Sequence, residues 1–263
     1  MNLWTGGAVT ARATCVLAPN PGLMTLDGTN TYVLAEPDSD LVVVVDPGPD
    51  DDRHLDQVAA TAEAGGRTVA LVLLTHGHLD HSGGASALAD RVGAPVRALD
   101  PAMCREAPPL QAGRLSVGGL ELVVVATPGH TADSVCFVLP ADGALLTGDT
   151  VLGRGTTVVA HPDGRIADYL ASLDDLAGVV SSRRLGELLP GHGPTRPDPG
   201  AVVAAYQAHR LERLEQVRAA LAAGANTPMA VVETVYADVD RALWPAAEQS
   251  VRAQLDYLRG LAP

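Results

Sequence analysis

The sequence predicts an α/β fold, because short apolar strand patterns alternate with helical patterns through the first two hundred residues. The run Leu41–Val45 predicts a buried strand that ends at Asp46–Gly48, and the run Val69–Leu74 predicts a second one. Between them, apolar residues from 55 to 62 recur at helical spacing. With 263 residues, 47% of them hydrophobic, the chain has enough apolar material for a sizeable core.

The same alternation continues further along this region. Ser82–Val92 predicts a helix and Leu120–Ala126 predicts a strand. Val135–Leu139 and Ala144–Thr147 predict the two strands of a hairpin, joined through Ala141–Gly143. Polar residues follow several of these strands, and open α/β sheets place their chemistry at the carboxyl ends of strands. We therefore expect a functional site at that edge.

The pattern changes after a proline-rich break at Thr195–Gly200. Beyond it, apolar residues recur at helical spacing in three segments, which we expect to be three short helices. The segments are Val203–Leu221, Val231–Tyr236 and Val251–Leu258. The sequence thus predicts two domains, an α/β domain over residues 1–198 and a small helical domain over residues 199–263.

The net charge of −13 is carried almost entirely by the first two hundred residues. Residues 201–263 hold six Arg and seven acidic residues, so residues 1–200 hold 12 basic and 24 acidic groups, a balance of −12. All 18 basic residues are Arg. A protein that grips nucleic acid by charge normally has a basic face. The composition therefore argues against DNA as a partner and weakens an RNA hypothesis.

Cysteine usage and hydropathy give expectations about the compartment. The three cysteines are widely spaced and form no Cys-x-x-Cys pair, which favours free thiols in a reducing environment. No apolar run reaches 18 residues, and the N-terminal segment lacks a signal-peptide pattern. We expect a cytoplasmic protein with no membrane partner. The oligomeric state stays open, and a homo-oligomer is compatible with the sequence.

A histidine-rich segment, Thr75–His81, carries the strongest chemical signal. Its residues His76, His78 and Asp80 stand at alternate positions, so in an extended loop they point to the same side, and His81 approaches from the start of the next helix. Imidazole and carboxylate are ligands of divalent metal ions. From this composition, a His-x-His-x-Asp-His run arises by chance with a probability of roughly one in a thousand.

With three later segments that match in order, the chain resembles the metallo-β-lactamase superfamily. Those segments are Thr127–Thr131, Leu146–Thr150 and Pro190–Gly193. The resemblance implies a four-layer αβ/βα sandwich with its site along the sheet edges. It also implies two metal ions, with one held by His76, His78 and His130, the other by Asp80, His81 and His192, and Asp149 bridging both.

The implied chemistry is hydrolysis by a hydroxide that two dications share, because such ions lower the pKa of bound water. Zinc is the expected metal, although the same ligands accept iron or manganese. Asp80 is the candidate catalytic residue, since it can both ligate and orient the nucleophile. Asp149 stands where the first class of metal-dependent β-lactamases has a Cys. The arrangement is similar to the glyoxalase-II type, so β-lactam hydrolysis is expected to be minor at most.

The other histidines are not expected to bind metal. His54 lies on the polar side of a helix and is expected to be a solvated surface residue, His161 sits in a turn, and His209 lies on the long C-terminal helix. Asp46 ends the strand before the site. It either orients the histidine loop or is a plain residue of the strand-end turn.

The segment Asn20–Tyr32 and the helical tail resemble lactamase-beta-2-like proteins, which carry a small winged-helix-like C-terminal domain. The activities of that subgroup are single-strand endoribonuclease and thioester hydrolysis. The resemblance makes Asn30 and Thr31 candidates for substrate binding, or alternatively caps of a first hairpin. Candidates from the tail are Tyr206, His209 and Arg210.

Three hypotheses follow. The first is a thioester or ester hydrolase acting on a small or carrier-linked acyl group, and the second is a metal-dependent endoribonuclease acting on single-stranded RNA. The third is a nucleic-acid-binding regulator that uses the C-terminal domain. Thr227–Ala237 weakens the third, because it has no Arg and one Glu, whereas a groove-reading helix needs basic and polar groups. The sequence does not identify the bond that is cut.

Overall fold

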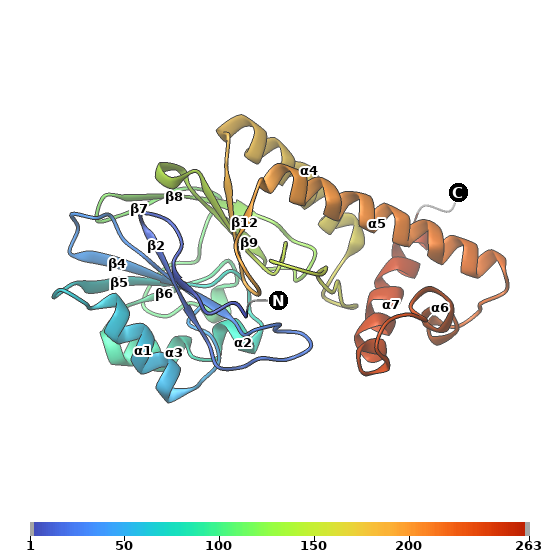
Figure 1. Ribbon diagram of the computed structural model, residues 1–263, viewed down its shortest axis with the longest axis horizontal. Helices are drawn as coiled ribbons and strands as arrows, with labels where there is room; N and C mark the ends of the chain where they lie inside the picture. The colour runs from blue at the N-terminus through green and yellow to red at the C-terminus, as the bar shows by residue number, and fades with distance from the viewer. Residues whose placement is uncertain (1–2, 261–263) are drawn as a thin grey trace.

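Two six-stranded mixed sheets face each other in the computed structural model, which describes residues 3–260 (Figure 1). The first sheet has the order β1-β2-β3-β4-β5-β6, in which β4 pairs with β5, and β5 with β6, in parallel. Its strands are β1 (Gly7–Ala8), β2 (Ala13–Leu17), β3 (Asn30–Leu34), β4 (Leu41–Val45), β5 (Thr68–Leu73) and β6 (Val96–Arg97).

The second sheet has the order β12-β11-β10-β9-β8-β7, and only β10 and β11 pair in parallel. Its strands are β7 (Gly113–Val117), β8 (Leu120–Ala126), β9 (Val135–Leu139), β10 (Ala144–Gly148), β11 (Glu187–Pro190) and β12 (Arg196–Pro197). The predicted hairpin is confirmed, with β9 and β10 joined by the short 3-10 turn η2 (Pro140–Asp142).

Helices cover the outer face of each sheet. On the first sheet they are α1 (Asp52–Ala62), the single turn α2 (Leu79–Ser82) and α3 (Ala85–Val92), while η1 (Pro101–Met103) follows β6. On the second sheet they are α4 (Ile166–Arg183) and α5 (Pro199–Ala222). The predicted helix Ser82–Val92 is therefore split, since α2 ends before Gly83 and Gly84 and α3 begins after them.

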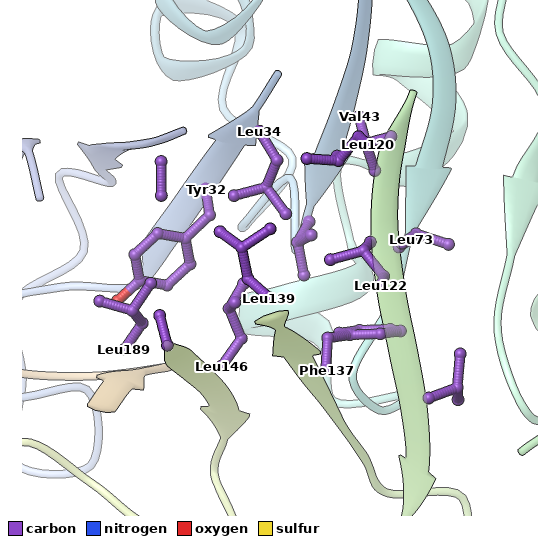
Figure 2. Packing of buried hydrophobic residues seen from close by; sticks show 14 of the residues in the cluster. Tyr32, Leu34, Val43, Leu73, Leu120, Leu122, Phe137, Leu139, Leu146 and Leu189 are labelled. Atoms are coloured by element: carbon purple, nitrogen blue, oxygen red, sulfur yellow. The ribbon is translucent and has the colours of Figure 1, made fainter. Parts of the chain in front are cut away.

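Three apolar layers hold this arrangement together. Between the sheets, side chains such as Tyr32, Leu34 and Leu73 meet Phe137, Leu146 and others from the opposite sheet (Figure 2). Along β4, Val43 and Val45 face this central layer, whereas Val42 and Val44 face α1 and α3. Burial on both faces explains why the strand is a continuous apolar run. The chain is thus a four-layer sandwich of helices, sheet, sheet and helices.

The C-terminal module is helical and begins inside the sandwich. It contains the end of α5, α6 (Pro228–Val235), η3 (Arg241–Leu243) and α7 (Trp244–Gly260), and no strand lies between residues 199 and 260. The first of the three helices is long, with 24 residues, rather than short as the sequence predicts. Its first half packs on the second sheet and its last turns pack on α6 and α7. The division after residue 198 stays a prediction.

The loops that follow β5, β8, β10 and β11 emerge at one edge of the sandwich. They carry, in order, His76, His130, Asp149 and His192. Among the described residues, no helix combines the length and apolar character needed to cross a membrane.

Candidate metal centre

The histidine loop after β5 is held at both ends by Asp46, the residue that follows β4. The carboxylate Oδ1 of Asp46 accepts from the backbone N of Thr75 at 2.7 Å, and its Oδ2 accepts from Thr75 Oγ1 at 2.7 Å. The same Oδ2 accepts from His81 Nδ1 at 2.9 Å. Asp46 is buried, with 2% of its surface exposed. Of the two interpretations left open by the sequence, these contacts favour the orienting one.

His76, His78 and His130 form a first group of candidate ligands. Nδ1 of His78 lies 3.1 Å from Nε2 of His76 and 3.1 Å from Nε2 of His130. His130 Nδ1 donates to the carbonyl of Val158 at 2.7 Å, so its Nε2 carries the lone pair. The single proton of Thr75 Oγ1 goes to Asp46, so His76 Nδ1 donates to that oxygen at 3.0 Å, and His76 Nε2 is also a lone pair.

Asp80, His81 and His192 form a second group. The Nε2 atoms of His81 and His192 lie 3.1 Å apart, and Oδ2 of Asp80 is 3.1 Å from His192 Nε2. His192 Nδ1 donates to the carbonyl of Gly28 at 3.1 Å, and His81 Nδ1 donates to Asp46. In both rings the outer nitrogen, Nδ1, therefore donates a hydrogen bond, and the inner nitrogens, the two Nε2 atoms, face each other.

Asp149 lies between the two groups. Its Oδ1 is 3.4 Å from His81 Nε2, and its Oδ2 is 3.4 Å from His192 Nε2 and 3.9 Å from His130 Nε2. Oδ1 is buried without a hydrogen-bond partner. The close approach depends on Gly191, because a Cβ there would stand 2.5 Å from Asp149 Oδ1 and 2.7 Å from His81 Cε1.

Burial and charge compete inside this cluster. Burial lowers the pKa of His76 well below its usual range. Burial acts in the same direction on His192, but Asp149 and Asp80 outweigh it and raise that pKa to about 9. Burial raises the pKa of Asp149, yet positive charge on His192 and His81 prevails and holds it well below its usual range. The carboxylates thus draw positive charge into the cluster.

These observations fit metal binding. The inner imidazole nitrogens converge, since Nε2 of His81 and of His192 lie 3.1 Å apart, as do His130 Nε2 and His78 Nδ1, and once unprotonated they offer a divalent cation several lone pairs together. A histidine that binds a metal ion usually donates its outer N–H group to a carbonyl or carboxylate oxygen. The cluster of histidine and aspartate side chains is therefore capable of binding metal ions.

Asn30 and Thr31 are placed away from the site surface. Asn30 Nδ2 donates to the carbonyls of Pro190 at 2.9 Å and Gly193 at 2.8 Å, and its Oδ1 accepts from Trp4 Nε1 at 2.7 Å. Thr31 Oγ1 lies 2.9 Å from His54 Nε2. Both residues are fully buried. Asn30 supports the turn that carries His192, and a role of either residue in substrate binding stays a prediction.

The prediction for His54 is wrong, because its side chain is buried and not solvated. Asp51 caps α1 by accepting from the backbone N of His54 at 2.9 Å, which places His54 in the first turn of that helix. Its ring lies under Gly48, where a Cβ would stand 3.0 Å from His54 Nε2. His161 is half-exposed and its Nε2 lies 3.1 Å from Asp256 Oδ2. Among the described residues, no candidate ligand group contains His54, His161 or His209.

A cavity of about 330 Å³ opens at His130 and Asp149 and runs towards the C-terminal module. His209 and Arg210 line it, and their role in substrate binding stays a prediction. Tyr206 does not line it; its hydroxyl accepts from the backbone N of Leu152 at 2.8 Å and supports one wall. Sequence reasoning missed other lining residues, including Arg213 and Tyr236. Arg213 follows Arg210 by three positions on one helix, a spacing that places both side chains on the same face.

Comparisons with known proteins agree with this geometry. Residues 24–192 match the sequence profile described as Metallo-beta-lactamase superfamily. Residues 227–259 match that of the Beta-lactamase associated winged helix domain, so the helical C-terminal module is of that type.

Two curated relatives and one solved structure illustrate the likeness. The Beta-lactamase-like protein 2 homolog of Drosophila melanogaster is 31% identical over 268 residues, which cover 92% of this chain and 86% of that protein. The Atrochrysone carboxyl ACP thioesterase of Aspergillus chevalieri is 31% identical over 245 residues, covering 88% of this chain and 75% of that protein. A metallo-beta-lactamase family protein from Thermus thermophilus shares the fold, with a TM-score of 0.76 at 24% identity, and the match covers 94% of this chain and 93% of that one.

Proposed function

This chain belongs to the metallo-beta-lactamase superfamily, a family of hydrolases, and we propose that it is a two-metal hydrolase that cleaves thioesters or esters of small or carrier-linked acyl groups. The observation that carries the proposal is the position of the Asp149 carboxylate between two ligand groups, at the mouth of a largely apolar cavity. A carbonyl group placed there can face both metal positions while its acyl group occupies the cavity.

His76, His78 and His130 would hold one cation, Asp80, His81 and His192 the other, and Asp149 would contact both. The two cations, zinc by ligand chemistry with iron or manganese as alternatives, would polarise the substrate carbonyl and lower the pKa of a water molecule. Asp46 keeps the ring of His81 turned towards the cluster, and Val158 does the same for His130.

Asp80 is proposed to move the proton. Burial raises its pKa, but the neighbouring His192 and His81 outweigh burial and lower it, so the carboxylate is charged at neutral pH. About 31% of its side chain is exposed, so one oxygen can reach water while Oδ2 contacts His192. The water oxygen forms the new C–O bond, the C–S bond breaks, and the leaving sulfur takes up the proton that Asp80 received.

Two observations support an acyl substrate over RNA. The relative from Aspergillus chevalieri is named a carboxyl ACP thioesterase. In addition, a groove on the other side of His78 is lined by Asp100, Asp133 and Asp163, and this acidic rim repels a phosphate backbone. The hypothesis of a regulator that binds nucleic acid through the C-terminal module has less support still. Val231 and Val232 of α6 are buried in the module core, so these side chains do not face a partner.

The decisive experiment assays metal-analysed protein in parallel on acyl thioesters, single-stranded RNA and a chromogenic β-lactam. We expect thioester hydrolysis that is lost on chelation and restored by zinc. Asp80→Asn should lower kcat by at least about 100-fold, the usual contribution of general acid–base catalysis. Asp175→Asn is the matched control, because this exposed aspartate lies on α4 far along the sequence from every candidate ligand.

Cleavage of RNA without thioester hydrolysis would reverse the ranking of the two enzymatic hypotheses. Absence of all three activities in metal-loaded protein would refute the enzyme proposal.

A further inference from the structure

The cavity that opens at the metal centre has the size of a small-molecule site. Its volume of about 330 Å³ lies at the lower end of the range for ligand pockets. Apolar side chains form most of its wall, including Leu26, Leu152, Val158, Val239 and Leu243. These residues come from three separate parts of the chain, so the cavity is completed by the C-terminal module. A single acyl group fits this space.

One wall of the cavity, on α5, is cationic. Its charge comes from Arg210 and Arg213, with His209 beside them, and none of the three has a carboxylate within salt-bridge distance among the described residues. Arg213 Nη1 donates only to neutral oxygens, those of Gln216 and Val235, each at 2.8 Å. The Arg213 guanidinium packs on the ring of Tyr236 at 4.5 Å, which fixes its position.

Arg210 is the most unusual member of this wall. Only 4% of its surface is exposed, and its Nε atom is buried without a hydrogen-bond partner. Its Nη2 donates to the carbonyl of Thr157, and its guanidinium lies 5.0 Å from the ring of Tyr169. A buried guanidinium that lacks an anionic partner is costly, and buried charges are normally paired. An anion in the cavity would supply the missing partner.

The other charges around the cavity do not supply that anion. Arg154 is itself a cation and is paired with Asp27, and the carboxylate of Asp149 faces the histidine cluster instead of the arginines. The pKa of His209 is lowered by burial and then by Arg210 and Arg213, which agrees with a positive potential at this wall. In a chain whose net charge is −13, a cationic wall inside an apolar cavity is a local exception.

We propose that the cavity binds an acyl group whose apolar body bears a carboxylate, and that this carboxylate pairs with Arg210 and Arg213. The inference rests on the proposed function, because it assigns the scissile carbonyl to the metal end of the cavity. A guanidinium pairs bidentately with a carboxylate or a phosphate, and the small, largely apolar cavity favours the carboxylate of an acyl chain. Arg210 and Arg213 would then be residues that determine specificity.

The first test compares two N-acetylcysteamine thioesters of equal chain length, hexanoyl and adipoyl, which differ in a terminal carboxylate. For the wild-type protein we expect kcat/KM to be at least about tenfold higher for the adipoyl thioester, the effect of one charge-assisted contact. Arg210→Met and Arg213→Met should each lower the adipoyl-to-hexanoyl ratio, and Arg213→Lys should restore part of it. Using the ratio removes any general effect of Arg210 on the loop that contains Thr157.

Arg218→Met is the matched control, because it removes the same charge from α5 where Arg218 pairs with Glu215 outside the cavity. This variant should keep the wild-type ratio. Equal kcat/KM values for the two thioesters, or a ratio unchanged in both Arg210→Met and Arg213→Met, would overturn the proposal.

A second test does not depend on hydrolysis. Calorimetry on metal-depleted full-length protein measures binding of octanoate and of octan-1-ol, and we expect Arg213→Met to lower the octanoate-to-octanol affinity ratio at least about tenfold. If thioesters are not cleaved but this ratio still depends on Arg213, the proposed function fails and the carboxylate site stands. If a single-stranded RNA displaces octanoate and itself depends on Arg213, the arginines bind phosphate and the carboxylate proposal fails.

Discussion

Replacing Asp46 with asparagine is expected to weaken metal binding without removing any candidate ligand. The carboxylate of Asp46 accepts three hydrogen bonds, from Thr75 N, Thr75 Oγ1 and His81 Nδ1. An asparagine that keeps the bond to Thr75 N must turn its NH₂ group towards His81 Nδ1. Because two donors cannot face each other, the proton of His81 moves to Nε2, the nitrogen that faces His192 and Asp149.

The size of the effect follows from the bonds exchanged. The variant lacks the charge-assisted hydrogen bond from His81 Nδ1 that holds the productive tautomer in the wild type, a bond worth about 1.5–3 kcal/mol. This corresponds to a loss of about 10- to 150-fold in metal affinity. The range overlaps the usual 10- to 100-fold effect of changing a residue that orients a histidine ligand.

The assay is competition for zinc against a chromogenic chelator, with imidazole ¹⁵N shifts as a second measurement of the His81 tautomer. Asp175→Asn, an exposed change of the same kind, should bind zinc as the wild type does. Wild-type zinc affinity in Asp46→Asn, together with an unprotonated His81 Nε2, would refute the reasoning.

Two further predictions concern packing and pH. Gly191→Ala places a Cβ 2.5 Å from Asp149 Oδ1, so we expect a folded protein with at least about tenfold weaker zinc binding. The control is Gly178→Ala on helix α4, where no atom lies within 4 Å of the added Cβ. This control should keep the zinc affinity and gain about 0.5–1 kcal/mol of stability. Burial raises the pKa of Asp142, but hydrogen bonds from Thr10 and Arg12 outweigh burial and lower it. Its contribution is therefore complete above the unfolded pKa of about 3.9 and is lost as the pH falls through the folded pKa. We expect Asp142→Asn to lower the free energy of unfolding by about 1–3 kcal/mol at pH 7 and by less near pH 3, measured by urea denaturation; an equal loss at both pH values would contradict the assignment.

The apolar pattern of the sequence predicts those strands that are buried on both faces between two apolar layers. Leu41–Val45 is one such case, because every position of β4 is apolar and every position after the first is buried, on one face or the other. The histidine motif was equally accessible, since four candidate ligands lie within six consecutive positions. Their convergence with His130 and His192 followed only from the family resemblance.

Contacts between distant segments explain what the sequence did not predict. His54 looks solvated on a helical projection of α1, yet the loop after β4 and the side chain of Thr31 cover it. Helix α4 was not predicted, although its buried face, including Tyr169 and Leu173, packs on the second sheet. An irregular stretch precedes it, so no strand pattern leads into it. The cavity escaped prediction because segments far apart in the sequence form its walls.

Helix α5 explains why the metal centre and the C-terminal module form one functional unit. Val202 and Val203 belong to the outer layer of the sandwich, whereas Val217 and Ala220 belong to the module core. Between these ends, Tyr206 holds Leu152 and Arg210 holds Thr157, at two points of the loop that leads from Asp149. The adjoining carbonyl of Val158 orients His130. A boundary placed after residue 198 therefore separates the loop that follows Asp149 from the helix that fixes it, and residues of the module form one wall of the cavity beside that loop.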